Sequence, residues 1–151
     1  MPNKKEPTPA LRAPNWMRQI FAVFELLSPY LTARLASLLF FTPIRFKAPK
    51  HELEFSRNSK TKTIKFKNNK VQFYEWGSAE KAILLVHGWA GRATQVAHLA
   101  APLMKAGYKV YSFDAPAHGN SNGRHTHIME FSDLIFRIKE LHPEIESIIG
   151  H

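Results

Sequence analysis

Two short polar clusters in this 151-residue chain have the residue types and the placement that chemistry requires. The first is His87-Gly88-Trp89-Ala90-Gly91, which directly follows the apolar run 82–86. The second covers Asp114 to Ser121 and follows the largely apolar residues 109–113. Ligands of α/β sheets bind at the carboxyl ends of strands, so both clusters are expected to line one site. Cysteine is absent, which excludes thiol nucleophiles and thiolate zinc sites.

A metal site is the alternative use of the histidines. His125-Thr126-His127 could bind a metal together with His118, because imidazole is a common metal ligand. A His-x-His pair in a loop without neighbouring carboxylates is more often a chance arrangement. We therefore expect no metal site and no cofactor.

The elements that must position the two clusters alternate between strands and helices. The run 82–86 is apolar throughout, as expected of a strand buried on both faces of a parallel sheet. It is followed by a helical segment at 93–106 that Gly107 ends, a strand at 109–113, a helix at 128–141 and a strand at 146–149. This order predicts an α/β fold with a mostly parallel sheet flanked by helices.

Composition places the chain among globular proteins, with 44% hydrophobic and 22% charged residues. The net charge of +9 lies almost entirely in residues 1–80, which hold 14 Lys and Arg against 6 Asp and Glu. Within them, residues 63–67 and 71–76 alternate around Asn68-Asn69 and predict an antiparallel hairpin. A solvated strand face explains the lysines better than an anionic membrane or nucleic acid does, so no nucleic-acid partner is expected.

The N-terminal part of the chain divides by composition. Residues 1–15 are predicted to form a disordered, basic and Pro-rich tail. Residues 16–43 are predicted to form two apolar helices, with Ser28 as the N-cap of the second. A basic linker at 44–61 then precedes the α/β domain at 62–151. Charges interrupt the apolar runs, so no transmembrane helix or secretory signal is expected. The helices are expected to pack on the sheet domain rather than on lipid, in a cytoplasmic protein for which peripheral membrane contact is the alternative.

Four motifs in register resemble the first half of an α/β-hydrolase-fold serine hydrolase of the esterase and lipase type. They are the strand that runs into His87-Gly88-Trp89, the segment Gly107-Tyr108-Lys109-Val110, the loop Asp114-x-Pro116-x-His118-Gly119-x-Ser121, and Ile148-Ile149-Gly150-His151. Their order and spacing agree over residues 70–151. The resemblance implies the N-terminal part of an α/β-hydrolase fold, with the strand 82–86 between the strands 109–113 and 146–149.

The resemblance also implies site residues. The backbone N–H of Trp89 corresponds to a donor of the oxyanion hole, and His87 and Gly88 form the supporting turn. Aimed N–H groups of this kind stabilise the negative charge that acyl transfer places on a carbonyl oxygen. His118 is expected to be a hydrogen-bonded loop histidine rather than an acid or a base. Ala117 stands where the family commonly has glycine, which draws attention to its backbone angles.

In the family, the strand that ends in Gly150-His151 continues into Gly-His-Ser-x-Gly, whose serine is the nucleophile. That serine and the later acid and base are therefore expected beyond His151, and none of Ser112, Ser121 and Ser132 replaces it. The expectation is a chain that is inactive alone and whose complete form cleaves a small-molecule carboxylic ester or related acyl bond. The alternative is a non-catalytic protein that binds a membrane or a partner through its N-terminal helices.

Overall fold

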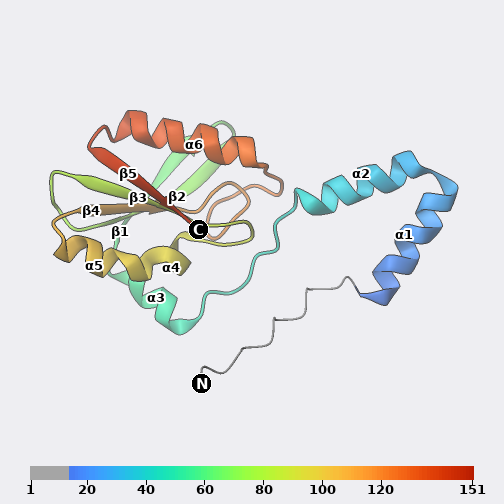
Figure 1. Cartoon of the computed structure of the whole chain (residues 1–151), viewed down its shortest axis with the longest axis horizontal. Helices are drawn as coiled ribbons and strands as arrows, with labels where there is room; N and C mark the ends of the chain where they lie inside the picture. The colour runs from blue at the N-terminus through green and yellow to red at the C-terminus, as the bar shows by residue number, and fades with distance from the viewer. Residues whose placement is uncertain (1–13) are drawn as a thin grey trace, which may run out of the picture. The chain divides into compact units, whose positions relative to one another are not determined.

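The computed structural model describes residues 14–151, which form parts of two compact units, Met1–Leu39 and Phe40–His151 (Figure 1). The expected tail at 1–15 lies outside the described residues except for its last two. In the first unit, α1 (Asn15–Leu27) and α2 (Pro29–Phe40) are the two predicted helices. The hydroxyl oxygen of Ser28 accepts the N–H of Leu31 at 3.4 Å, as expected of an N-cap. No helix within residues 14–151 has the length and hydropathy needed to cross a bilayer.

The second unit is built on one mixed sheet of five strands in the order β1-β2-β4-β3-β5. The strands are β1 (Lys60–Phe66), β2 (Asn69–Trp76), β3 (Ala82–Val86), β4 (Lys109–Phe113) and β5 (Ile145–Gly150). β3 is parallel to both of its neighbours, β4 and β5, whereas β2 is antiparallel to β1 and β4. The predicted fold class and the central place of β3 are therefore confirmed.

Helices cover both faces of this sheet (Figure 1). On one face lies α6 (Ile128–Leu141), whose buried residues Phe131, Leu134 and Ile138 pack on side chains of β2, β3 and β4. On the other face, α4 (Ala93–Val96), the 3-10 helix η1 (Ala97–Leu99) and α5 (Ala100–Lys105) pack on the alternate side chains of the same strands. Because every residue of β3 is buried, its carboxyl end is fixed from both sides.

Two details differ from the sequence prediction. The hairpin turn lies at Lys67-Asn68, one residue before the predicted Asn68-Asn69, since Phe66 pairs with Asn69. Contacts distant in sequence accompany this register: Lys67 pairs with Asp133 at 2.8 Å, and Asn122 accepts the N–H of Lys70 at 2.6 Å. The helical segment at 93–106, for which Pro102 predicts a kink or restart, consists of three short segments, the last of which begins at Ala100, two residues before Pro102.

A short helix that the sequence did not predict lies in the basic segment 44–61. This helix, α3 (Lys50–Arg57), buries Glu52 and lies beside α4. The carbonyl of Phe55 in α3 accepts the indole N–H of Trp76 at 3.0 Å. Part of the basic segment is therefore ordered structure that reaches the sheet and the loop after β3.

Candidate active site

Both polar clusters lie at the carboxyl ends of two neighbouring parallel strands, β3 and β4. The cluster after β3 forms a tight turn in which the N–H of Gly91 donates to the carbonyl of Gly88 at 3.0 Å. Ala90, the third residue of this turn, has φ 56, as in a type II turn. A Cβ at position 91 would lie 2.8 Å from the carbonyl oxygen of Gly88, so this turn requires glycine there.

The backbone N–H groups of this turn differ in whether they have a hydrogen-bond acceptor. The N–H of Gly91 is used within the turn, and the N–H of Ala90 donates to Nε2 of His118 at 3.1 Å. Among residues 14–151, no hydrogen-bond acceptor is bound to the N–H of Trp89. The amide of Trp89, like that of Gly88, therefore has no acceptor within these residues and is available to a ligand.

The side chain of Trp89 is 42% exposed and lies among aromatic rings. It stacks on Phe40 with ring centroids 5.8 Å apart and an interplanar angle of 16°. The edge of a second ring, that of His118, lies at 5.3 Å. Pocket residues beside the turn include Phe46, Gln95 and His151, around a volume of about 410 Å³. The residue with the available amide thus lines a pocket that also has Phe46 in its wall.

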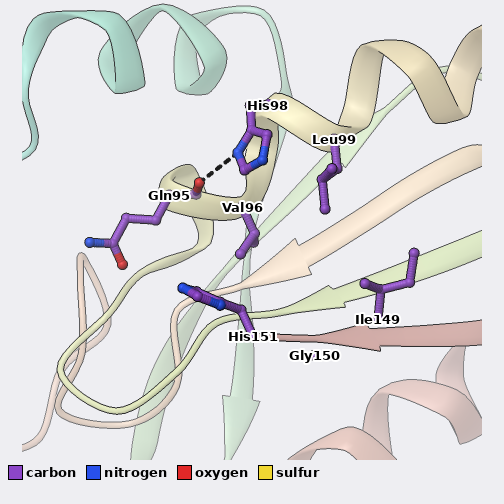
Figure 2. Close-up of a pocket in the computed structure, with 7 residues that line it drawn as sticks. All are labelled: Gln95, Val96, His98, Leu99, Ile149, Gly150 and His151. Carbon is purple, nitrogen blue, oxygen red and sulfur yellow. Dashed lines mark hydrogen bonds between the residues drawn. The ribbon is translucent and has the colours of Figure 1, made fainter. Parts of the chain in front are cut away.

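Gly88 brings this turn close to the end of β5. A Cβ at position 88 would lie 2.8 Å from the backbone oxygen of His151, a distance that side chains do not adopt. The N–H of His151 in turn donates to the carbonyl of Val86 at 3.0 Å. A second hollow of about 450 Å³ adjoins the same strand end (Figure 2). In it, Val96 and Leu99 point from α4 and η1 toward β5, and His98 bonds the carbonyl of Gln95 at 2.9 Å.

The two histidines of the clusters are buried, with 2% of His87 and 1% of His118 exposed. Nε2 of His87 accepts the N–H of Ala115 at 3.1 Å, and its Nδ1 lies 2.8 Å from the carbonyl of Gly88. Nδ1 of His118 lies 3.0 Å from the carbonyl of Pro116. Burial lowers the pKa of each histidine to about 4, because desolvation penalises the charged ring. Both rings are neutral at pH 7.

Asp114 organises the loop after β4. Its carboxylate accepts the N–H of Ala93 at the start of α4 at 2.7 Å, the N–H of Asn120 at 2.8 Å and the hydroxyl of Tyr74 at 3.0 Å. Burial is the main influence on this carboxyl and raises its pKa, although the three hydrogen bonds act in the opposite direction. A Cβ at Gly119 would overlap the carboxylate, so a side chain there would displace it. Asp114 is therefore a structural anchor between β2, α4 and the loop.

Ala117 adopts a left-handed backbone with φ 64. This is the position at which the resembling family commonly has glycine, so the alanine here carries the strain that glycine avoids. The guanidinium of Arg45 donates to the carbonyls of Ala117 at 3.0 Å and Gly123 at 3.0 Å. Arg45 thus clamps the loop from outside.

The sequence did not identify the buried ion pair behind the turn. Arg92, which follows Gly91, donates to both carboxylate oxygens of Glu52 at 2.6 and 3.1 Å and to the carbonyl of Phe46 at 3.0 Å. Thr94 adds a hydroxyl bond to Glu52 at 2.8 Å. Burial alone would raise the pKa of Glu52, but the bonds from Arg92 and Thr94 outweigh it and lower that pKa. The one available signal was that Glu52 and Glu54 are the only acids among nine bases at 45–70.

The other candidate residues do not converge on this turn. Ser112 and Ser121 are buried and donate to the carbonyls of Leu85 and Asp114, and Ser132 lies on α6. Nδ1 of His125 bonds the hydroxyl of Thr42. Within residues 14–151, no three His, Asp or Glu side chains gather in a way that could hold a metal ion.

Comparisons with known proteins agree with this geometry. Residues 77–146 match the family described as serine aminopeptidase, S33. A monoacylglycerol lipase of Mycolicibacterium smegmatis is 31% identical in an alignment 77 residues long that covers 46% of this chain and 28% of the lipase. This chain therefore spans little more than a quarter of that curated relative.

Two solved structures share both fold and moderate sequence identity. The thioesterase domain from the curacin biosynthetic pathway superposes with a TM-score of 0.54 at 27% identity, over 62% of this chain and 35% of that domain. An esterase of Pyrococcus furiosus superposes with a TM-score of 0.52 at 26% identity, over 72% of this chain and 45% of the esterase. The similarity thus covers more than half of this chain and less than half of either relative.

Proposed function

Because this chain has the N-terminal part of an α/β-hydrolase fold, we propose that it supplies the oxyanion-stabilising half of a serine hydrolase. The reaction is cleavage of a carboxylic ester or related acyl bond. Trp89 provides a backbone N–H to the developing oxyanion, while His87 and Gly88 support the turn. A single donor of this kind contributes roughly 3 kcal/mol to transition-state stabilisation.

The observation that carries this proposal is the state of the Trp89 amide. The next two amides of the turn have acceptors, whereas the Trp89 amide has none among the described residues. An N–H without a protein acceptor at this place can donate to a ligand oxygen. The turn also follows a buried parallel strand, where sheet proteins of this class bind their ligands.

The proposed substrate is a small-molecule ester or acyl compound. The relatives with moderate identity are named a lipase, an esterase and a thioesterase, and each name refers to an acyl bond. Phe46 and Trp89 beside the available amide favour an apolar group next to the scissile carbonyl. The proposal includes no metal, no cofactor and no nucleic acid.

Neither Ser112 nor Ser121 is placed to act as the nucleophile. The hydroxyls of Ser112 and Ser121 are buried in bonds to backbone carbonyls, and neither has a histidine partner. Nε2 of His87 and of His118 accept backbone N–H groups, so neither ring is free to act as a base. We therefore propose that the 151-residue chain is inactive alone and that the serine, acid and base lie in residues beyond it.

The test compares the 151-residue chain with the product of the gene at its natural length. Hydrolysis of short p-nitrophenyl esters and labelling by a fluorophosphonate probe are measured for both. We expect turnover and a labelled serine outside residues 1–151 in the natural-length product, and neither in the 151-residue chain. Labelling of Ser112 or Ser121 would contradict the proposal, as would a natural-length product that hydrolyses no acyl substrate.

The role of Trp89 requires a change in its backbone. Trp89→Ala keeps the N–H, so kcat should fall by less than about threefold. Replacing the Gly88–Trp89 amide by an ester removes the N–H and should lower kcat by about 100-fold or more. A matched ester at the Lys105–Ala106 linkage, outside the site, controls for the backbone chemistry itself. Equal effects of the two esters would rule out the oxyanion role.

A further inference from the structure

The loops after β3 and β4 hold each other through two histidines that act in opposite directions. His87, from the loop after β3, accepts the N–H of Ala115 in the other loop. His118, from the loop after β4, accepts the N–H of Ala90 in the first loop. The two ring centroids are 5.0 Å apart. Each loop thus contributes one ring and one backbone amide to a reciprocal pair.

Both rings are required in one protonation state. In each ring Nε2 accepts an N–H, so the single ring proton is on Nδ1. That proton is donated to a carbonyl of the same loop, Gly88 for His87 and Pro116 for His118. A proton added to Nε2 of His118 would face the N–H of Ala90. The bond therefore exists only with a neutral ring.

The hydrogen bond to His118 comes from Ala90, the residue of the turn whose backbone is strained. Ala90 has φ 56, a conformation that costs a residue with a Cβ about 1 kcal/mol. Rotation of the Trp89–Ala90 peptide would convert the type II turn to type I and relieve that strain. It would also turn the N–H of Ala90 away from His118. The His118 acceptor consequently favours the strained turn over the relaxed one.

We infer that His118 is a positioning residue for the oxyanion turn. It holds the Trp89–Ala90 peptide in one orientation, and its ring also contacts the rings of Trp89 at 5.3 Å and Phe131 at 5.1 Å. It thereby fixes the peptide on the carboxyl side of Trp89, and the Trp89 side chain, next to the amide that meets the substrate oxygen. This role rests on the proposed function of Trp89 and assigns no proton transfer to His118.

Two variants distinguish the role of His118 as a hydrogen-bond acceptor from the role of its aromatic ring in packing. His118→Phe keeps an aromatic ring against Trp89 and Phe131 but removes the acceptor. His118→Gln replaces the ring by an amide whose oxygen can accept the N–H of Ala90. The control is His51→Phe, because His51 is exposed on α3 and belongs to neither polar cluster.

The first readout is ester hydrolysis by the natural-length product. We expect His118→Phe to lower kcat by about tenfold or more, with KM within about twofold, because oxyanion donors act in the transition state. His118→Gln should recover most of the kcat, and His51→Phe should match the parent protein. A His118→Phe variant with parental kcat would overturn the inference, as would equal losses in the Phe and Gln variants.

The second readout does not depend on activity. Hydrogen exchange at the Ala90 amide should be about tenfold faster in His118→Phe than in the parent chain and close to the parent in His118→Gln. Nitrogen chemical shifts of His118 should report a neutral ring with its proton on Nδ1 at pH 7, which tests the parent chain without any variant. A proton on Nε2, or an Ala90 amide equally protected in His118→Phe, would overturn the inference. If the parent hydrolyses no acyl substrate, the proposed function fails while exchange still decides the positioning.

Discussion

Glu52 and Arg92 form a two-bond ion pair at 2.6 and 3.1 Å, although 40 positions separate them in the sequence. Both are buried, with less than a tenth of either residue exposed. The pair joins α3 to the residue that directly follows the turn at 88–91. It therefore connects a helix in the basic segment to the backbone of the candidate site.

Glu52→Gln should destabilise the protein by about 3 kcal/mol, because it leaves the buried Arg92 charge without its counter-charge. Urea denaturation followed by circular dichroism measures this difference. Glu54→Gln, which changes an exposed residue of the same helix, is the matched control and should lie within about 0.5 kcal/mol of the parent. Equal stabilities for the two variants would show that the ion pair makes no net contribution.

Ala117→Gly should stabilise the protein by about 0.5–1 kcal/mol. The gain comes from relief of the left-handed backbone at φ 64, which exceeds the extra flexibility that glycine gives the unfolded chain. Ala115→Gly, at a buried position of the same loop without positive φ, should instead be destabilising. Thermal melts of the two variants give the comparison, and a lower melting temperature for Ala117→Gly contradicts it.

Lowering the pH should weaken the hydrogen bond by which His118 joins the loops after β3 and β4. Burial lowers the pKa of His118 to about 4, below its ordinary value of 6.5, so the unfolded chain binds more protons between these values. Stability from the neutral ring is complete above pH 6.5 and is lost as the pH falls toward 4. Arg45 and His87 beside His118 add to the lowering, whereas the Asp114 carboxylate opposes it.

The measurement is the free energy of unfolding at pH 7 and at pH 4.5. The loss between these two pH values should be smaller in His118→Gln than in the parent, by on the order of 1 kcal/mol. His98→Gln should lose as much as the parent. A His118→Gln variant with the full parental loss would show that His118 does not cause the dependence.

The sheet and the two clusters could be predicted because their signals are local. The apolar run of β3 and the polar residues that follow it lie within ten consecutive positions, 82–91. The helix α3, in contrast, could not be predicted, because its sequence has the composition of a solvent-exposed charged segment. Glu52 is buried only through its ion pair with Arg92, which lies 40 positions away in the sequence. The same holds for Arg45, which bonds carbonyls more than 70 positions away. Contacts at such separations leave no periodicity in either segment.

The backbone of the site was predicted less well than its residue types. Sequence similarity pointed to Trp89 and to the unusual Ala117, yet only the structure shows that the Ala90 amide is already bound to His118. The domain boundaries inferred from composition remain predictions. In the structure, the first unit ends at Leu39, and Phe40 stacks on Trp89 within the second.

The apolar residues of α1 provide a test of the alternative function. Exposed side chains of α1 include Trp16 at 60% and Leu26 at 89%, and a hollow of about 350 Å³ runs along Trp16, Ile20 and Phe24. We expect this surface to pack on protein, so the chain should not co-sediment with phosphatidylserine-containing vesicles in low salt. Co-sedimentation that Ile20→Glu abolishes, but Gln19→Glu does not, would favour the membrane-binding alternative.

Because Gly88 has no Cβ, its turn can lie in close contact with the end of β5. At 2.8 Å, any side chain at position 88 would occupy the volume of the His151 backbone oxygen, so the turn and the strand would have to separate. Such a substitution alters no polar atom and no charge, yet it would widen the gap between the Trp89 amide and the end of β5. The distance between the turn and β5 therefore depends on the absence of a side chain at position 88, and a larger residue there would push the two apart.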